Sequence, residues 1–240
     1  MAYLEIQNIH KRFLTPGGRE VDALRGVSLE IERGDILCIT GNNGSGKTTL
    51  FNCLRQDFPW DEGSIMIDGK PIGNRKINVI SVFQEVGLGV VGSMTPLENL
   101  SLVFSKNPRF LYSFPKRKFE RKIHRFLEDT GLRERFDSFE NTPVSELSGG
   151  QRQQVAIMMA VMREPHLLLL DEFVANLDPN VRTDILTWMK SWVRENEVTM
   201  LMITHDLDLA EKWGNWILEL SDGESVRFER VCRKEEDLNV

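Results

Sequence analysis

The sequence has few cysteines and no long apolar run, and each shortage excludes a class of protein. Its 240 residues include three cysteines, Cys38, Cys53 and Cys232, which are odd in number and far apart. No two of them have the spacing of metal ligands, so a reducing compartment is the simplest expectation. The longest uncharged apolar run, Val155 to Met162, is far shorter than the about 20 residues that span a bilayer. The first residues also lack the apolar core of a signal peptide, so we expect a chain that is soluble by itself.

An excess of basic residues is also missing. The formal net charge is -6 and the isoelectric point is about 5.4, which argues against a nucleic-acid binder that works through a basic surface. Binding of a small anion needs only a few local hydrogen-bond donors, so the negative net charge does not exclude it. With 41% apolar and 28% charged residues, the composition is that of an ordinary globular domain, with room for one additional lobe.

The apolar pattern predicts an α/β fold. Near-continuous apolar runs over residues 35–40, 77–84, 166–172 and 198–205 predict strands covered on both faces, as in a parallel sheet. Residues 3–9 and 63–69 alternate more, which predicts an antiparallel edge. Asp178 can cap a helix that has Pro179 at its first position.

A helical lobe is expected from about Glu85 to Glu146, where apolar side chains recur at helical spacing from Phe119 to Leu127. The predicted division is a core of residues 1–84 and 148–225, a helical lobe of residues 85–147 and a C-terminal tail of residues 226–240, whose last part we expect to be frayed.

The segment GNNGSGKT, Gly41 to Thr48, matches the phosphate-loop pattern and lies between a predicted strand and a predicted helix. Its glycines let successive backbone N–H groups point at one anion, and the helix start adds positive potential. Lys47 would reach the β- and γ-phosphates, and Thr48 would hold Mg²⁺. The predicted ATP-binding residues here are Gly41, Asn42, Asn43, Gly44, Ser45, Gly46, Lys47, Thr48 and Thr49.

An acidic pair follows the predicted strand at residues 166–172. Asp171 can reach the Mg²⁺ sphere, and Glu172 can polarise a water for attack on the γ-phosphate. An Asp-Glu pair after a strand is often only a helix cap. The phosphate loop elsewhere in the chain favours the catalytic interpretation.

A second glycine pair occurs in LSGGQ, Leu147 to Gln151, directly before an apolar helical segment. Ser148, Gly149 and Gly150 offer a hydroxyl and backbone N–H groups to a phosphate. Because the phosphate loop already wraps the triphosphate from one side, we predict that LSGGQ serves a nucleotide held by another copy of the chain. A two-fold dimer would then enclose two ATP molecules. The alternative is an ordinary glycine-rich helix start.

The ordered set GNNGSGKTT, VFQE, LSGGQRQ, LLLLDE, NLDP and ITHD resembles the nucleotide-binding subunits of ABC transporters, over nearly the whole chain. The resemblance implies a P-loop NTPase core with a mostly parallel sheet, an antiparallel β edge subdomain and an inserted α-helical subdomain. It implies that Gln84 is a hinge residue that binds Mg²⁺ and ATP and takes part in catalysis. It also implies that Leu177 and Asp178 cross the dimer interface, where Asp178 contacts ATP, and that His205 contacts the γ-phosphate and the attacking water. By the same resemblance, LSGGQ is the signature of the family, and Gln151 in it contacts ATP. Phe13 aligns with the aromatic residue that stacks on adenine, although a core Phe is a rival interpretation.

By the same resemblance, the expected function is an ATPase subunit that forms a head-to-tail homodimer and drives a separate membrane permease. A solute-binding protein is an expected further partner, nucleic acid is not, and the place is the cytoplasmic face of the cell membrane. A weaker resemblance, in GSMTPLENL, KWGNWIL and the residues after Glu172, is to the branch of tryptophan/tyrosine-type amino-acid importers.

Two other functions use a similar ATPase. One is a non-transport role, in cell-division signalling or iron–sulfur cluster assembly. The other is a DNA-repair or chromosome-structuring ATPase, which would carry a long coiled coil or zinc-binding cysteines before the signature. The segment between Thr48 and Leu147 has no sustained heptads and only Cys53, which argues against the second.

Overall fold

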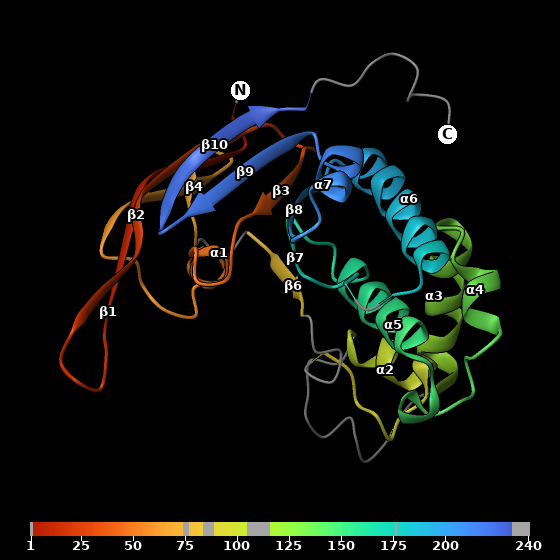
Figure 1. The fold of residues 1–240 in the computed structure, drawn as a ribbon. Coiled ribbons are helices and arrows are strands. Elements are labelled where there is room, and N and C mark those ends of the chain that lie inside the picture. The colour runs from red at the N-terminus through yellow and green to blue at the C-terminus, as the bar shows by residue number, and fades with distance from the viewer. Residues whose placement is uncertain (1, 74–76, 84–88, 105–115, 176, 232–240) are drawn as a thin grey trace. The chain divides into compact units, whose positions relative to one another are not determined.

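The computed structural model describes residues 2–73, 77–83, 89–104, 116–175 and 177–231 (Figure 1). The chain divides into two compact units. The first unit contains Met1–Ser81, His166–Glu172 and Met189–Val240, and the second contains Val82–Pro165 and Phe173–Trp188. The predicted boundaries between core and helical lobe, at 84/85 and 147/148, stay a prediction. The last part of the C-terminal tail, which we expect to be frayed, lies outside the described residues. Among the described helices, none is both long enough and apolar enough to cross a bilayer.

A six-stranded sheet contains all four predicted apolar strands. Its order is β10-β9-β3-β8-β7-β6, and β3 pairs in parallel with β8 and β9, as does β7 with β8. Every residue of β3 and β8 is buried, as the continuous apolar runs predict. The strands are β3 (Ile36–Thr40), β6 (Val79–Val82), β7 (Leu167–Asp171), β8 (Thr199–Ile203), β9 (Trp216–Ser221) and β10 (Glu224–Arg230).

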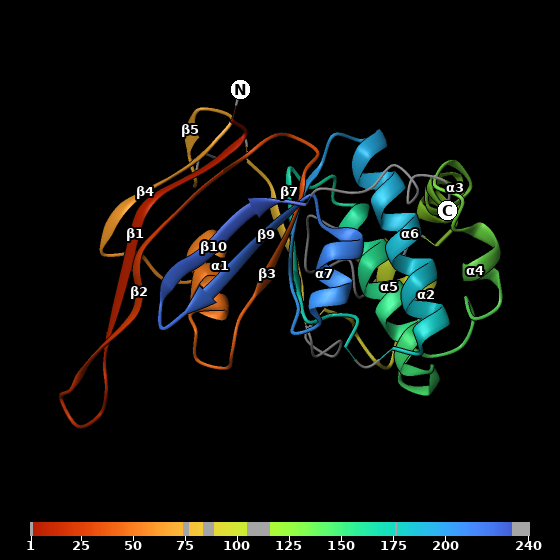
Figure 2. The ribbon, with the colours of Figure 1, turned by 45° about the horizontal axis from the view of Figure 1, so that its top comes forward.

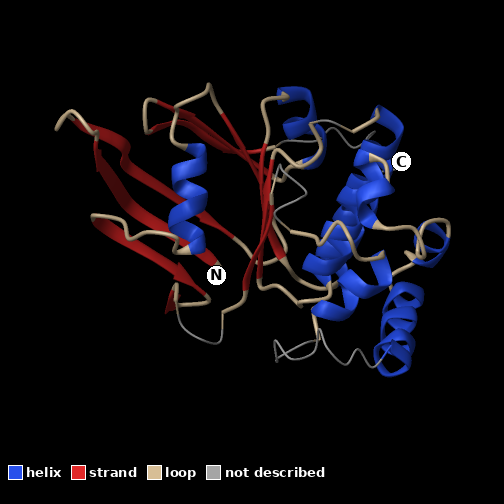
Figure 3. Ribbon diagram, turned by 90° about the horizontal axis from the view of Figure 1, so that it is seen from below, coloured by secondary structure: helices blue, strands red, loops and turns tan. Residues whose placement is uncertain are grey.

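A second, antiparallel sheet has the order β2-β1-β4-β5, and it contains both segments predicted as the antiparallel edge. Its strands are β1 (Leu4–Leu14), β2 (Glu20–Ile31), β4 (Glu62–Ile67) and β5 (Lys70–Pro71). Helix α1 (Lys47–Arg55) contributes Leu50, Phe51 and Leu54 to a core shared with both sheets. Figure 3 shows α1 with strands on both of its sides. This packing holds the start of α1 against the ends of the strands.

The second unit is helical (Figure 2). The predicted lobe helix is α3, and its Ile123 and Leu127 are fully buried, with Phe119 and Phe126 packed against the same cluster. The α/β fold with a mostly parallel sheet, an antiparallel part and a helical part is therefore confirmed. The elements are α2 (Pro96–Leu102), α3 (Lys116–Asp129), α4 (Arg133–Asp137), the 3₁₀ turn Val144–Glu146, α5 (Gly149–Val161) and the first turns of α6 (Pro179–Glu195); α7 (Leu207–Trp213) belongs to the first unit.

Two helix starts have side-chain caps, of which the one at Asp178 is as predicted. Oδ1 of Asp178 accepts a hydrogen bond from the backbone N–H of Asn180, 2.9 Å away, at the start of α6. At α5, Oγ of Ser148 accepts from the N–H of Gln151, and the Gln151 side chain accepts from the N–H of Ser148. This reciprocal pair is a capping box, which satisfies two backbone donors of the first turn.

Candidate functional site

The loop between β3 and α1 has a backbone that only glycine fits at two positions. Gly41 and Gly46 have φ angles of 135° and 105°. A Cβ atom on Gly41 would lie 2.2 Å from the carbonyl oxygen of Leu220, and one on Gly46 would lie 2.7 Å from that of Ala23. The loop is therefore held against β2 and β9 by contacts to rigid backbone. This fixes the directions of its N–H groups.

We expect Gly41→Ala to lower the free energy of unfolding more than Gly44→Ala. Both residues have positive φ, so both variants are strained, but no described atom lies within 4 Å of a Cβ on Gly44. The excess for Gly41→Ala should be about 1–3 kcal/mol, the usual cost of overpacking. Urea unfolding of the two variants measures this difference. Equal losses would show that the approach to Leu220 is not a rigid constraint.

The loop offers donors for an anion. Nζ of Lys47 donates hydrogen bonds to the carbonyl oxygens of Gly41 and Asn42, at 2.8 and 2.9 Å. Burial lowers the pKa of the Lys47 ammonium, and the nearby carboxylates of Glu172 and Asp171 oppose this effect. Oγ of Ser45 is buried and makes no hydrogen bond within the part of the chain that the structure describes. A buried polar atom without a partner is costly, so a phosphate oxygen in this loop would satisfy it.

The acidic pair lies at the carboxyl end of β7, as predicted. Asp171 pairs in register with Ile203 of β8, so both strands end at the same edge of the sheet. Burial raises the pKa of the Asp171 carboxyl; the positive charges of Arg55 and Lys47 lower it, and Glu172 raises it further. A half-buried carboxylate that sits among two cations and another acid is the electrostatic setting of a functional site.

Glu172 and His205 contact each other directly. Nε2 of His205 lies 2.6 Å from Oε1 of Glu172, and since a carboxylate has no proton to give, the imidazole N–H donates. Glu172 has φ of 46°, a left-handed conformation that is uncommon for residues other than glycine, and its N–H donates to the carbonyl oxygen of Ile203. The strained backbone aims the Glu172 side chain toward the end of β8, where His205 follows the strand.

The donor chemistry of this unit fits Mg²⁺ bound with a nucleotide. Thr48 is exposed in the first turn of α1, and Asp171 supplies a carboxylate at the strand end. Hydroxyl and carboxylate oxygens are the ligands that Mg²⁺ prefers, and it commonly takes only one or two from the protein. Thr48 and Asp171 would therefore hold the ion. Gln84, the third predicted metal ligand, lies outside the described residues.

In the second unit, LSGGQ forms the start of α5. A Cβ atom on Gly150 would contact the side chains of Val181 and Leu177 at 3.4 and 3.7 Å, which is ordinary van der Waals distance. A Cβ on Gly149 would meet no described atom within 4 Å. Packing within the described chain therefore explains neither glycine, although alanine would be the better helix former.

Phe13 lies on β1, opposite Val21 of β2, and is 37% exposed. Ala23, two residues from Val21, is the residue whose carbonyl group approaches Gly46 of the phosphate loop. Since a strand rises about 3.3 Å per residue, Phe13 lies about two residues along the sheet from that point. Phe13 is therefore a surface residue of β1, and its backbone lies near the point where β2 approaches the phosphate loop.

The groups around the Phe13 ring were not predicted from any motif in the sequence. Nζ of Lys11 lies 5.4 Å from the ring centroids of both Phe13 and Phe58, and the two rings meet edge to face with centroids 5.2 Å apart. Asp61 binds the Lys11 amino group at 3.1 Å. Phe58 and Asp61 belong to the loop after α1, and no motif or period links them with β1. Only the folded chain brings them together.

Comparisons with known proteins identify the family of the chain. A sequence model of the ABC transporter family matches residues 24–175, which is more than half of the chain. A tyrosine transport ATP-binding protein of Clostridioides difficile is 34% identical over 99% of this chain and 95% of its own length. A methionine import ATP-binding protein of Bordetella avium is 33% identical over 95% of this chain, which spans 62% of that protein's length.

A solved dimeric structure of the ATP-binding cassette MJ0796, in a post-hydrolysis state bound to ADP and Pi, superposes on 96% of this chain and 100% of that chain. The TM-score is 0.76 and the sequence identity is 29%. The phosphate loop, the acidic pair and these similarities lead to one assignment. The chain belongs to the ABC transporter family, as an ATP-binding subunit with ATPase activity.

Proposed function

We propose that this chain energises the import of a small solute, with an amino acid as the first class to test. The observation that carries the proposal is the similarity to the tyrosine transport ATP-binding protein, which extends over almost the full length of both chains. The similar methionine import protein supports the same class of solute. The resemblance of GSMTPLENL and KWGNWIL to tryptophan/tyrosine-type amino-acid importers also supports an amino acid as the solute.

Hydrolysis would use the groups at the edge of the parallel sheet. Lys47 and the loop N–H groups bind the β- and γ-phosphates, while Thr48 and Asp171 hold Mg²⁺, which neutralises phosphate charge when bound. Glu172 accepts a proton from the attacking water. His205, which is hydrogen-bonded to Glu172, orients this water toward the γ-phosphate. Phe13 stacks on the adenine ring.

A second copy of the chain would complete the site. Ser148, Gly149 and Gly150 of one copy face the γ-phosphate held by the other, so that two ATP molecules lie between two subunits. The support is that packing explains neither glycine and that the capping box holds the first turn of α5 in a fixed conformation. The N-terminal end of a helix favours a negative charge, as a phosphate provides. Asp178 and Leu177, at the start of α6, would lie in the same interface.

A separate permease would form the path across the membrane. The helical segment from Glu85 to Glu146 is the proposed docking surface, and Gln84 would couple it to the nucleotide. The subunit would therefore sit on the cytoplasmic face of the cell membrane, and a solute-binding protein would deliver the solute to the permease from the other side. ATP binding would close the dimer, and hydrolysis would reopen it.

Uptake in cells tests the proposal. In a strain that lacks the chain, wild-type protein should restore uptake of a labelled amino acid, screened first with tyrosine and methionine, and Glu172→Gln should not. Membranes from the same strain should yield permease subunits that co-purify with the wild-type chain. Normal uptake in the absence of the chain, with no membrane subunit recovered, would contradict the transport role and favour a non-transport function of the same ATPase.

A further inference from the structure

We propose that Lys11 and Phe58 are positioning residues that fix the orientation of the Phe13 ring for the nucleotide base. The inference rests on the proposed stacking of Phe13 on adenine. It adds two residues to the base site that have no place in the phosphate loop, the acidic pair or the signature. The argument concerns the first unit only, where β1, β4 and the loop after α1 belong to one compact body.

The Phe13 ring needs support because it sits near the end of β1 with 37% of its surface exposed. A partly exposed phenylalanine can sample several rotamers, and a base that stacks on it must first select one. Phe58 limits that freedom. Its ring lies at 90° to the Phe13 ring with the centroids 5.2 Å apart, the favoured edge-to-face arrangement of aromatic pairs. Phe58 itself is fixed because it packs against the core of the first unit.

Lys11 contacts both the Phe13 ring and the Phe58 ring. Its amino nitrogen lies 5.4 Å from both centroids, within the range of cation–π attraction. Lys11 is only 8% exposed, and a buried ammonium is costly unless it is paired. Asp61 provides that partner at 3.1 Å. The Lys11 amino group is therefore paired with Asp61 and lies at the same distance from both rings.

Asp61 also fastens the loop after α1 to β1. Its N–H donates to the carbonyl oxygen of His10, and its Oδ2 accepts from the N–H of Arg12 at 2.6 Å. The hydrogen bonds from the Arg12 backbone and from Lys11, in that order, hold the pKa of the Asp61 carboxyl below its usual value. These contacts bring Phe58, three residues before Asp61, beside Phe13.

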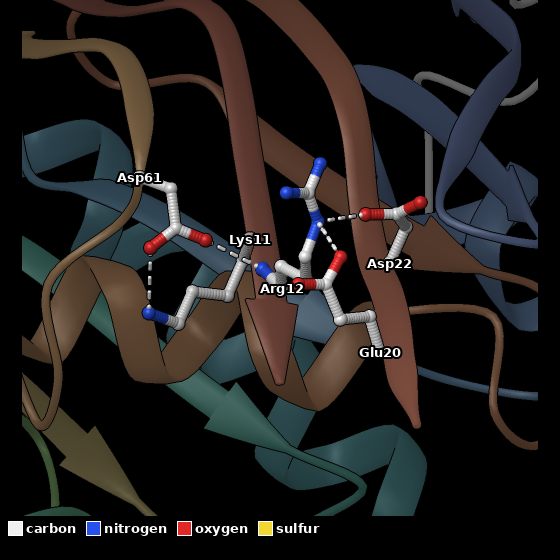
Figure 4. A network of polar contacts seen from close by, with 5 residues as sticks. All are labelled: Lys11, Arg12, Glu20, Asp22 and Asp61. Carbon is white, nitrogen blue, oxygen red and sulfur yellow. Dashed lines mark hydrogen bonds and ion pairs between the residues drawn. The ribbon is translucent and has the colours of Figure 1, made fainter. Parts of the chain in front are cut away.

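A neighbouring cation provides a matched control. Figure 4 shows Asp61 contacting Lys11 and the backbone of Arg12, whereas the Arg12 side chain points to Asp22 and Glu20 on β2. The Arg12 side chain is 55% exposed, and its ion pairs are of the exposed kind that contribute little. Arg12→Met therefore removes a charge from the same strand without removing a contact to either ring.

The test compares ATP with inorganic tripolyphosphate, which has no base, by calorimetric titration of the full chain with Mg²⁺. Phe58→Leu and Lys11→Met should each raise the Kd for ATP about two- to tenfold, as expected for loss of an aromatic or cation–π contact that orders the ring. The Kd for tripolyphosphate should stay unchanged. Phe58→Tyr, which keeps the aromatic ring, should bind ATP with the wild-type Kd. Arg12→Met should leave the Kd for ATP and the Kd for tripolyphosphate unchanged.

The outcomes separate this inference from the proposed base contact. Phe13→Ala should weaken the binding of ATP but not of tripolyphosphate. If it does so while Phe58→Leu and Lys11→Met bind ATP normally, the positioning role is wrong and the base contact stands. If Phe13→Ala leaves the ratio of the Kd for ATP to the Kd for tripolyphosphate unchanged, the positioning role and the base contact are both wrong. Equal weakening of ATP and tripolyphosphate in Phe58→Leu or Lys11→Met would indicate a general structural role and would also overturn the inference.

Discussion

Replacing Glu172 with glutamine should reduce the rate of ATP hydrolysis about 10²- to 10⁴-fold, the usual contribution of a general base. Glutamine keeps the size of the side chain, and its Oε1 can still accept the hydrogen bond from Nε2 of His205. It loses only the negative charge that takes up the proton of the attacking water. Lys47, Thr48 and Asp171 are unchanged, so ATP should still bind. Steady-state phosphate release and a nucleotide titration measure the two effects separately.

A nearby acid serves as the control for this variant. Asp206 caps α7, where its Oδ1 accepts a hydrogen bond from the N–H of Leu209, and it follows His205 directly. Asp206→Asn keeps an acceptor at the cap and should leave hydrolysis within about twofold of wild type, since Asn and Asp are comparable caps. A Glu172→Gln protein that hydrolyses ATP at the wild-type rate would show that Glu172 is not the base.

Lys47→Ala should cause the second large effect, a loss of ATP affinity of about ten- to hundredfold, because a charge-assisted hydrogen bond to phosphate contributes about 1.5–3 kcal/mol. The Lys47 amino group donates hydrogen bonds to the carbonyl oxygens of Gly41 and Asn42, so it is held within the loop. Turnover should fall with the affinity. A direct binding titration, together with a thermal unfolding curve, distinguishes lost contact from lost fold.

The control for Lys47→Ala is a lysine outside the loop. Lys70 forms an exposed ion pair with Asp68 at 3.2 Å, and Lys70→Ala removes the same side chain from the surface. It should leave ATP binding unchanged. Equal ATP affinity in the wild type and Lys47→Ala would contradict the interpretation of Gly41 to Thr48 as the phosphate-binding loop.

The strands that carry the site could be predicted because burial on both faces leaves a clear pattern. β3, β7 and β8 have continuous apolar sequences, and the residues after them form the loop, the acidic pair and the segment with His205. β2 was not predicted, since the bulge between Leu24 and Val27 breaks its alternation. β10 has no buried residue, so its sequence carries no apolar signal.

The chemistry within the site was less accessible from the sequence. The left-handed backbone of Glu172 depends on its hydrogen bond to Ile203 of another strand, and the contact with His205 follows from that geometry. The group around Phe13 depends on Asp61, which lies far from Phe13 in the chain. Motif spacing identifies which residues take part, but contacts between distant segments decide how each side chain is held.

We propose that two copies of the chain share each ATP, and the molar mass of Glu172→Gln in solution with ATP and Mg²⁺ distinguishes a shared site from two separate ones. Multi-angle light scattering should give twice 27.6 kDa, because unhydrolysed γ-phosphate keeps contact with Ser148 and Gly150 of the partner. Adding Ser148→Arg should return the mass to 27.6 kDa while each monomer still binds ATP, since a bulky cation replaces the small donor. A Glu172→Gln protein that stays at 27.6 kDa, or a double variant that still doubles its mass, would contradict the shared site.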